Sequence, residues 1–101
     1  MEFSGFDWDE GNRAKCQKHG LSVSTIESLF AQGLVVLPTR SDRESRFKGI
    51  GRTKDGRYVF VVFTLRGADD EVLIRPISSR YMHAKEVRAY EKENPGLQKR
   101  P

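Results

Sequence analysis

The sequence predicts an α+β domain in which helices pack on one face of a curved sheet. Two segments in the first third of the chain carry helix-capping residues, and residues 46–77 contain apolar runs separated by glycine-containing turns. After residue 80, apolar residues recur at helical spacing. The predicted order is a short N-terminal strand, two helices, an antiparallel β-meander and a C-terminal helix.

Length and composition indicate one domain with a basic surface. The 101 residues carry a net charge of +4, which fits a polyanionic partner but also an ordinary basic domain. The single cysteine excludes an intrachain disulfide and fits a reducing compartment. The chain opens without a signal-like segment and has no apolar run of membrane-spanning length, so we expect a cytoplasmic protein without membrane contact. We place the domain at residues 1–93 and a flexible tail at 94–101.

The N-terminal segment predicts a strand and a polar helix. Residues 1–8 contain three aromatic side chains and favour a short strand. Asp9 is placed to cap a helix over residues 10–19, and Gly20 to end it in the left-handed conformation. Charged and amide side chains dominate this helix, so we expect it, with Cys16, at the surface.

A second helix follows another capping signal. Residues 24–27 (Ser-Thr-Ile-Glu) match a capping box, in which serine and glutamate satisfy each other's backbone donors. The helix is predicted to bury Ile26, Leu29 and Phe30 and to end near Gly33.

The meander begins after that glycine. Residues 34–37 predict a strand that Pro38 stops, because proline has no backbone donor. Residues 39–45 are polar and predict a loop. Residues 46–53 predict the next strand, in which two glycines are interpreted as kinks.

The remaining turns separate two further strands. Residues 54–57 contain Asp-Gly and predict a type I′ hairpin turn. Residues 58–65 are apolar on both faces, which predicts a central strand. Residues 67–71 predict a turn, and the strand that starts at Val72 must be at an edge or bulged at Pro76.

This last strand is predicted to turn directly into the C-terminal helix. Ser78 or Ser79 could cap that helix. Arg75 and Arg80 would then lie on either side of a rigid junction. The helix has an apolar stripe formed by Ala84, Val87 and Tyr90.

Several kinds of site are poorly supported. His19 and His83 lie far apart, and the acidic residues 69–71 lack the alternating ligands of a calcium loop. The chain has no Gly-x-Ser-x-Gly elbow and no phosphate-binding glycine spacing. We therefore expect neither a metal site nor a cofactor.

The basic residues are more informative. Strand alternation places Arg66 on one face with Tyr58 and Phe60, so its charge must reach the rim, a carboxylate or a ligand. The simpler interpretation is that the arginines are solvated or paired with carboxylates. The candidate carboxylate partners are Glu44, Glu71 and Glu86.

An ordered set of short motifs resembles the BrnT family of toxin–antitoxin toxins. No single motif is specific, but together they cover roughly residues 6–91 in order and with family-like spacing. The motifs are Phe6-Asp7-Trp8-Asp9, Lys18-His19-Gly20, Glu44-Ser45-Arg46, Gly49-Ile50-Gly51-Arg52, Thr64-Leu65-Arg66, the run from Ile74 to Arg80, and Lys85-Glu86. Three positions depart from the family pattern, namely Asn12, Cys16 and Ser79.

The resemblance implies a RelE-like fold and a ribonuclease that cleaves RNA and arrests translation. It also implies a co-encoded BrnA-like antitoxin, and binding of operator DNA only through the toxin–antitoxin complex.

Metal-free RNA cleavage needs a base for the 2′-hydroxyl, cations for the phosphorane and an acid for the leaving oxygen. Arginine suits the second task, because its guanidinium binds two phosphate oxygens at once. The candidate catalytic residues are Lys18, Arg66, Arg80, His19, His83 and Glu86. The candidate RNA-binding residues are Arg46, Arg75 and Lys85.

Two other function classes remain open at this point. A small basic domain can bind nucleic acid or regulate transcription without cleaving, although no helix-turn-helix or RNP-like motif is present. The basic face could also only dock an acidic protein. Incubation with labelled RNA and EDTA distinguishes the three, because only the enzyme cleaves and only the binder shifts intact RNA.

Overall fold

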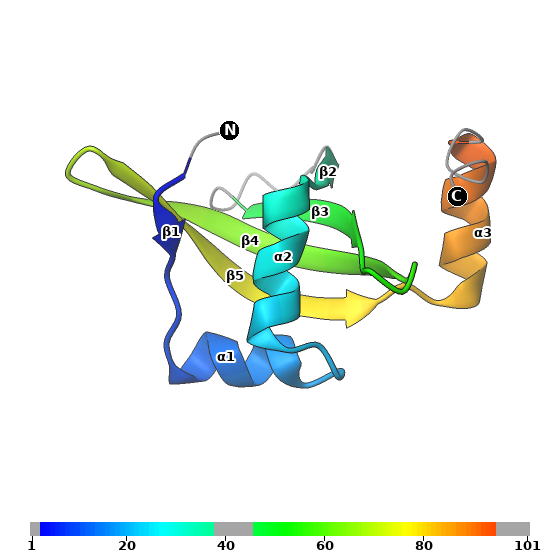
Figure 1. Cartoon of the computed structure of the whole chain (residues 1–101), viewed down its shortest axis with the longest axis horizontal. Helices are drawn as coiled ribbons and strands as arrows, with labels where there is room; N and C mark the ends of the chain where they lie inside the picture. The colour runs from blue at the N-terminus through cyan, green and yellow to red at the C-terminus, as the bar shows by residue number, and fades with distance from the viewer. Residues whose placement is uncertain (1–2, 38–45, 95–101) are drawn as a thin grey trace.

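The computed structural model describes residues 3–37 and 46–94, which form three helices and one five-stranded sheet (Figure 1). In chain order the elements are β1 (Gly5–Phe6), α1 (Glu10–Gln17), α2 (Val23–Gln32), β2 (Val35–Leu37), β3 (Arg46–Arg52), β4 (Tyr58–Ala68), β5 (Glu71–Tyr81) and α3 (Ala84–Glu93). The strand order is β1-β5-β4-β3-β2, with β1 parallel to β5 and the other pairs antiparallel. The α+β class, the element order and the central place of β4 are confirmed.

The core lies between one face of the sheet and helices α1 and α2 (Figure 1). Val61 and Phe63 of β4 are buried against Ile26 and Leu29 of α2, as predicted for that helix. A Cβ at Gly51 would lie 2.7 Å from the Leu34 side chain, so this glycine gives room for close packing. None of the described helices has the length and apolarity needed to cross a membrane.

The expected surface position of α1 is wrong for one of its faces. Asn12 is 6% exposed and Cys16 is fully buried. The Asn12 amide donates to the carbonyl oxygens of Asp7 and Pro76, both at 2.9 Å, and its oxygen accepts the Asp9 N–H at 2.7 Å. A polar residue can be buried when its hydrogen bonds are satisfied in this way. Burial also raises the pKa of the Cys16 thiol to about 11.

The N-terminal elements are shorter or shifted relative to the prediction. β1 contains only Gly5–Phe6, and α1 begins after the predicted cap, Asp9. The capping box at residues 24–27 is wrong, because Ser22 is the N-cap of α2 and accepts the Thr25 N–H at 3.1 Å. Glu27 instead accepts the indole N–H of Trp8 at 2.9 Å.

Both hairpin turns also differ in detail. Among residues 54–57 only Gly56 has a positive φ, 86°, so the turn is not type I′. The Gly56 N–H donates to the Thr53 carbonyl at 2.9 Å. The β4–β5 turn is tighter than the predicted 67–71, since only Asp69 and Asp70 lie between the strands. Pro38 with the predicted loop 39–45, and residues 95–101 of the predicted tail, lie outside the described residues.

The predicted strand–helix junction is wrong by several residues. β5 continues to Tyr81, and α3 starts after its N-cap residue, His83. Ser79 does not cap a helix, because its hydroxyl is buried and donates to the Cys16 carbonyl at 2.7 Å. Arg75 and Arg80 therefore both lie within β5 rather than on either side of a junction.

The position of Asn12 predicts a large effect on stability. Asn12→Ala would leave two carbonyls and one N–H without this partner in the interior, which should lower the free energy of unfolding by about 2–4 kcal/mol. Urea unfolding measures this difference. Gln17→Ala, on the exposed side of the same helix, should change stability by less than about 0.5 kcal/mol. Equal stability of the two variants would contradict a structural role for Asn12.

Candidate functional site

The face of the sheet opposite the core carries most of the predicted arginines. Directly paired residues of antiparallel strands project to the same side of a sheet. Arg46, Thr64 and Arg75 are such partners across β3, β4 and β5. Arg66 follows Thr64 by two residues and so shares this side. We call this side, opposite the core and α2, the open face.

A β-bulge brings Arg80 to the same face. Residues five positions apart in a regular strand project to opposite sides. In β5, however, Phe63 pairs with Pro76 and Val62 pairs with Ser78, which leaves Ile77 as an extra residue. The predicted irregularity near Pro76 is therefore confirmed, and it resets the alternation so that Arg75 and Arg80 share the open face.

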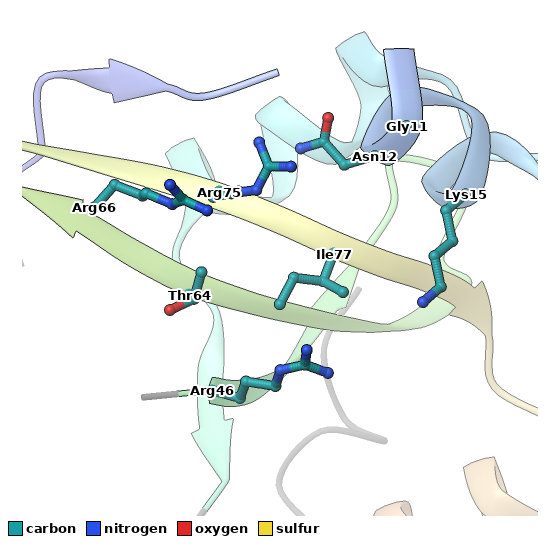
Figure 2. Close-up of a pocket in the computed structure, with 8 residues that line it drawn as sticks. All are labelled: Gly11, Asn12, Lys15, Arg46, Thr64, Arg66, Arg75 and Ile77. Carbon is teal, nitrogen blue, oxygen red and sulfur yellow. The ribbon is translucent and has the colours of Figure 1, made fainter. Parts of the chain in front are cut away.

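The largest concentration of charge on this face surrounds a groove of about 500 Å³ (Figure 2). Arg46, Arg66 and Arg75 enter it from three adjacent strands, and Lys15 enters from α1. Figure 2 shows these four cationic side chains around Ile77. Cations converging from four elements make the groove suited to an anion.

Two carboxylates offset part of this charge. Arg75 donates to Asp9 at 2.8 Å and lies 3.5 Å from Asp7. The Asn12 backbone N–H, followed by Arg75, holds the pKa of Asp9 below its usual value. The Arg66 guanidinium lies 3.8 Å from the Asp7 carboxylate, and the Arg66 side chain is 59% exposed. Arg66 is thus more accessible to a ligand than Arg75, whose side chain is 20% exposed.

A second, smaller pocket of about 160 Å³ contains Arg80. Two parallel hydrogen bonds of 2.8 and 2.9 Å join its guanidinium to Glu86, which also accepts the His83 N–H at 2.8 Å. These bonds lower the pKa of Glu86 to about 2. Glu86 is therefore ionised at neutral pH, and it fixes the plane of the Arg80 guanidinium.

The structure brings only some of the other predicted residues to these two cavities. His19 lines the pocket of Arg80. Lys18 is the exposed C-cap residue of α1 and lines neither cavity, and His83 and Lys85 are exposed at the start of α3. Within residues 3–37 and 46–94, no group of three or more metal-ligating side chains could hold an ion.

Sequence reasoning missed two cations of the open face. Lys48 follows Arg46 by two residues in the same strand, so alternation alone could have found it. Lys15 could not be found in this way, because its place depends on how α1 packs against β5.

Comparison with known proteins identifies the family. The family described as the ribonuclease toxin BrnT of type II toxin–antitoxin systems matches residues 8–86. This chain belongs to the BrnT family. The 1.1 Å crystal structure of the Brucella abortus ribonuclease toxin BrnT is similar, with a TM-score of 0.57 and 26% sequence identity. The alignment covers 78% of this chain and 96% of the Brucella chain. No curated protein sequence matches this chain.

The family match confirms the BrnT resemblance and the general ribonuclease class that it implied. The similar crystal structure confirms the α+β fold. The RelE-like relationship and the individual catalytic roles stay predictions.

The lowered pKa of Glu86 predicts a specific sensitivity to acid. A carboxyl group whose pKa is lower in the folded than in the unfolded state stabilises the fold. For Glu86 this contribution is complete above the unfolded-state pKa of 4.5, and it is lost as the pH falls toward the folded-state pKa of about 2. The free energy of unfolding of Glu86→Gln should therefore decrease less steeply than that of the wild type over this interval. Denaturant unfolding at several pH values measures both slopes.

Glu93→Gln, at the exposed end of α3, is the control and should follow the wild-type slope. If the Glu86→Gln slope also equals that of the wild type, the Arg80–Glu86 pair does not contribute to acid stability.

Proposed function

We propose that this chain is a metal-independent endoribonuclease that binds RNA on the open face of its sheet and arrests translation. The observation that carries the proposal is the convergence of arginines from three adjacent strands on one face. Arg46, Arg66, Arg75 and Arg80 share this face, and their guanidinium groups suit phosphate oxygens. Membership in a family of ribonuclease toxins supports RNA as the ligand.

In this proposal the arginines divide two tasks. Arg80 is held by Glu86 and stabilises the negative charge of the phosphorane, whereas Arg66 lies in the separate larger groove and binds the RNA there. Arg46 and Arg75 bind neighbouring phosphates. The arrangement needs no divalent ion, because guanidinium groups provide the charge that a metal would otherwise supply.

The residue that transfers protons is chosen by its distance from Arg80. His19 lines the pocket of Arg80, and an imidazole can both donate and accept a proton. Lys18 is adjacent in the chain and stays a second candidate. Glu86 positions Arg80 and does not act as the base, because a carboxylate with a pKa of about 2 binds a proton weakly.

The decisive experiment is incubation of the purified protein with labelled RNA in the presence of EDTA. Cleavage supports the proposal. A shift of intact RNA without cleavage would indicate a non-catalytic nucleic-acid-binding module. The absence of both cleavage and a shift would indicate a protein-docking module. Loss of cleavage on adding EDTA would contradict the metal-free mechanism.

Arg80→Ala should reduce the cleavage rate by on the order of a hundredfold, because the transition state then has one stabilising cation fewer. Glu86→Gln keeps the guanidinium but removes its bidentate partner, so it should give a smaller reduction. Initial rates on a fixed RNA measure both effects, with circular dichroism to confirm folding. Arg57→Ala removes an equal charge over the Tyr81 ring and should retain wild-type activity. A fully active, folded Arg80→Ala variant would exclude Arg80 from catalysis.

We further propose that a BrnA-like antitoxin neutralises the enzyme by covering the open face. Expression of the toxin alone should stop growth, and co-expression of the adjacent gene should restore it. The Arg66→Ala/Arg80→Ala variant should bind the antitoxin more weakly and with a smaller salt dependence, because both charges lie on the covered face. Antitoxin affinity measured at several salt concentrations tests this. An unchanged affinity and slope would place the antitoxin elsewhere.

A further inference from the structure

Lys48 and Phe60 lie in the pocket of Arg80 and have no part in the mechanism above. The three side chains come from β3, β4 and β5, so Phe60 stands on the middle strand between the two cations. The Lys48 ammonium is 4.0 Å from the centroid of the Phe60 ring, and the Arg80 guanidinium carbon is 4.9 Å from it. One aromatic ring therefore holds a cation from each neighbouring strand.

This arrangement brings like charges close together. Two cations repel each other, but the electron-rich face of an aromatic ring attracts each of them. Glu86 compensates the charge of Arg80, whereas Lys48 has no ion-pair partner among the described residues. Lys48 is half-buried. The pocket consequently has an uncompensated positive charge beside a fixed guanidinium, which is the environment that an oxyanion stabilises.

We propose that Lys48 and Arg80 bind the same RNA phosphate in this pocket, and that Phe60 is the positioning residue that holds both cations. The pocket is small and lies on the open face, with His19 among its lining residues. The proposal deepens the proposed function and rests on it, because it takes RNA as the ligand.

The test measures binding without chemistry. A single-stranded 2′-O-methyl RNA oligonucleotide cannot be cleaved, because the attacking hydroxyl is blocked. Dissociation constants are measured at several salt concentrations. The slope of log Kd against log salt concentration gives the number of phosphates neutralised, at about 0.7 per phosphate on a single strand. Because Arg80 still holds the shared phosphate, Lys48→Ala should bind more weakly with a slope that falls by less than about 0.7, whereas Lys48→Ala/Arg80→Ala should lose about 0.7 in total. The matched control Arg57→Ala, whose charge lies over the Tyr81 ring and which lines neither cavity of the open face, should keep the wild-type affinity and slope.

Variants of Phe60 separate the aromatic ring from simple packing. Phe60→Leu should bind the oligonucleotide roughly 2- to 5-fold more weakly for each cation that the ring no longer holds, whereas Phe60→Tyr keeps the ring and should bind like the wild type. In the Lys48→Ala background the effect of Phe60→Leu should shrink, because one of the two cations that the ring holds is already absent. Equal melting temperatures of the variants confirm that folding is unaffected.

Several results would overturn the inference. These are a Lys48→Ala affinity equal to that of Arg57→Ala, a Lys48→Ala/Arg80→Ala slope smaller by about 1.4, as two separate phosphates would give, equal weakening by Phe60→Leu and Phe60→Tyr, or no measurable binding by the wild type at low salt. Disappearance of the Phe60→Leu effect on an oligonucleotide with abasic sites would also overturn it, since the ring would then stack on a base. Failure of the proposed function is distinguishable: unmodified RNA would remain uncleaved while these binding effects persist.

Discussion

The packing of α1 against β5 is the contact on which the rest of the structure depends. β1 pairs with β5 only at Leu73 and Ile74, so the following residues of β5 need other partners. Asn12 donates to the Pro76 carbonyl, and Ser79 donates to the carbonyl of Cys16. These buried hydrogen bonds would be costly to leave unmade. They fix the helix along the strand, and the same packing brings Lys15 to the larger groove of the open face.

The open face depends on a second feature of the same strand. The bulge at Ile77 shifts the alternation of β5 by one residue, so Arg75 and Arg80 project to one side. Without it, one of them would point toward the core, where an unpaired charge is too costly to bury. The irregularity in the strand is therefore what allows a single basic surface to extend across β3, β4 and β5.

The two cavities of this surface differ in how their arginines are held. In the larger groove, Asp7 and Asp9 come from the segment before α1 and hold Arg75, while Arg66 is left largely exposed. In the smaller pocket, Glu86 of α3 holds Arg80. No residue of α3 is buried, and the helix also contacts β4 through Tyr58 and Tyr90. A helix outside the core thus controls the orientation of one of the main candidate catalytic groups.

The sequence by itself determined the fold class, the central strand, the core of α2 and the family, because apolar periodicity and short ordered motifs are local signals. It also determined that arginines are the main candidates for function. Only the tertiary structure decided which of them share a face, since the bulge residue becomes visible only in the pairing of β4 with β5. Burial of Asn12 and Cys16 was missed for the same reason, because Asn12 bonds to Pro76 and Cys16 to Ser79, each more than 60 residues away in the chain. The extension of β5 past Ser79 was missed because it depends on pairing with the start of β4.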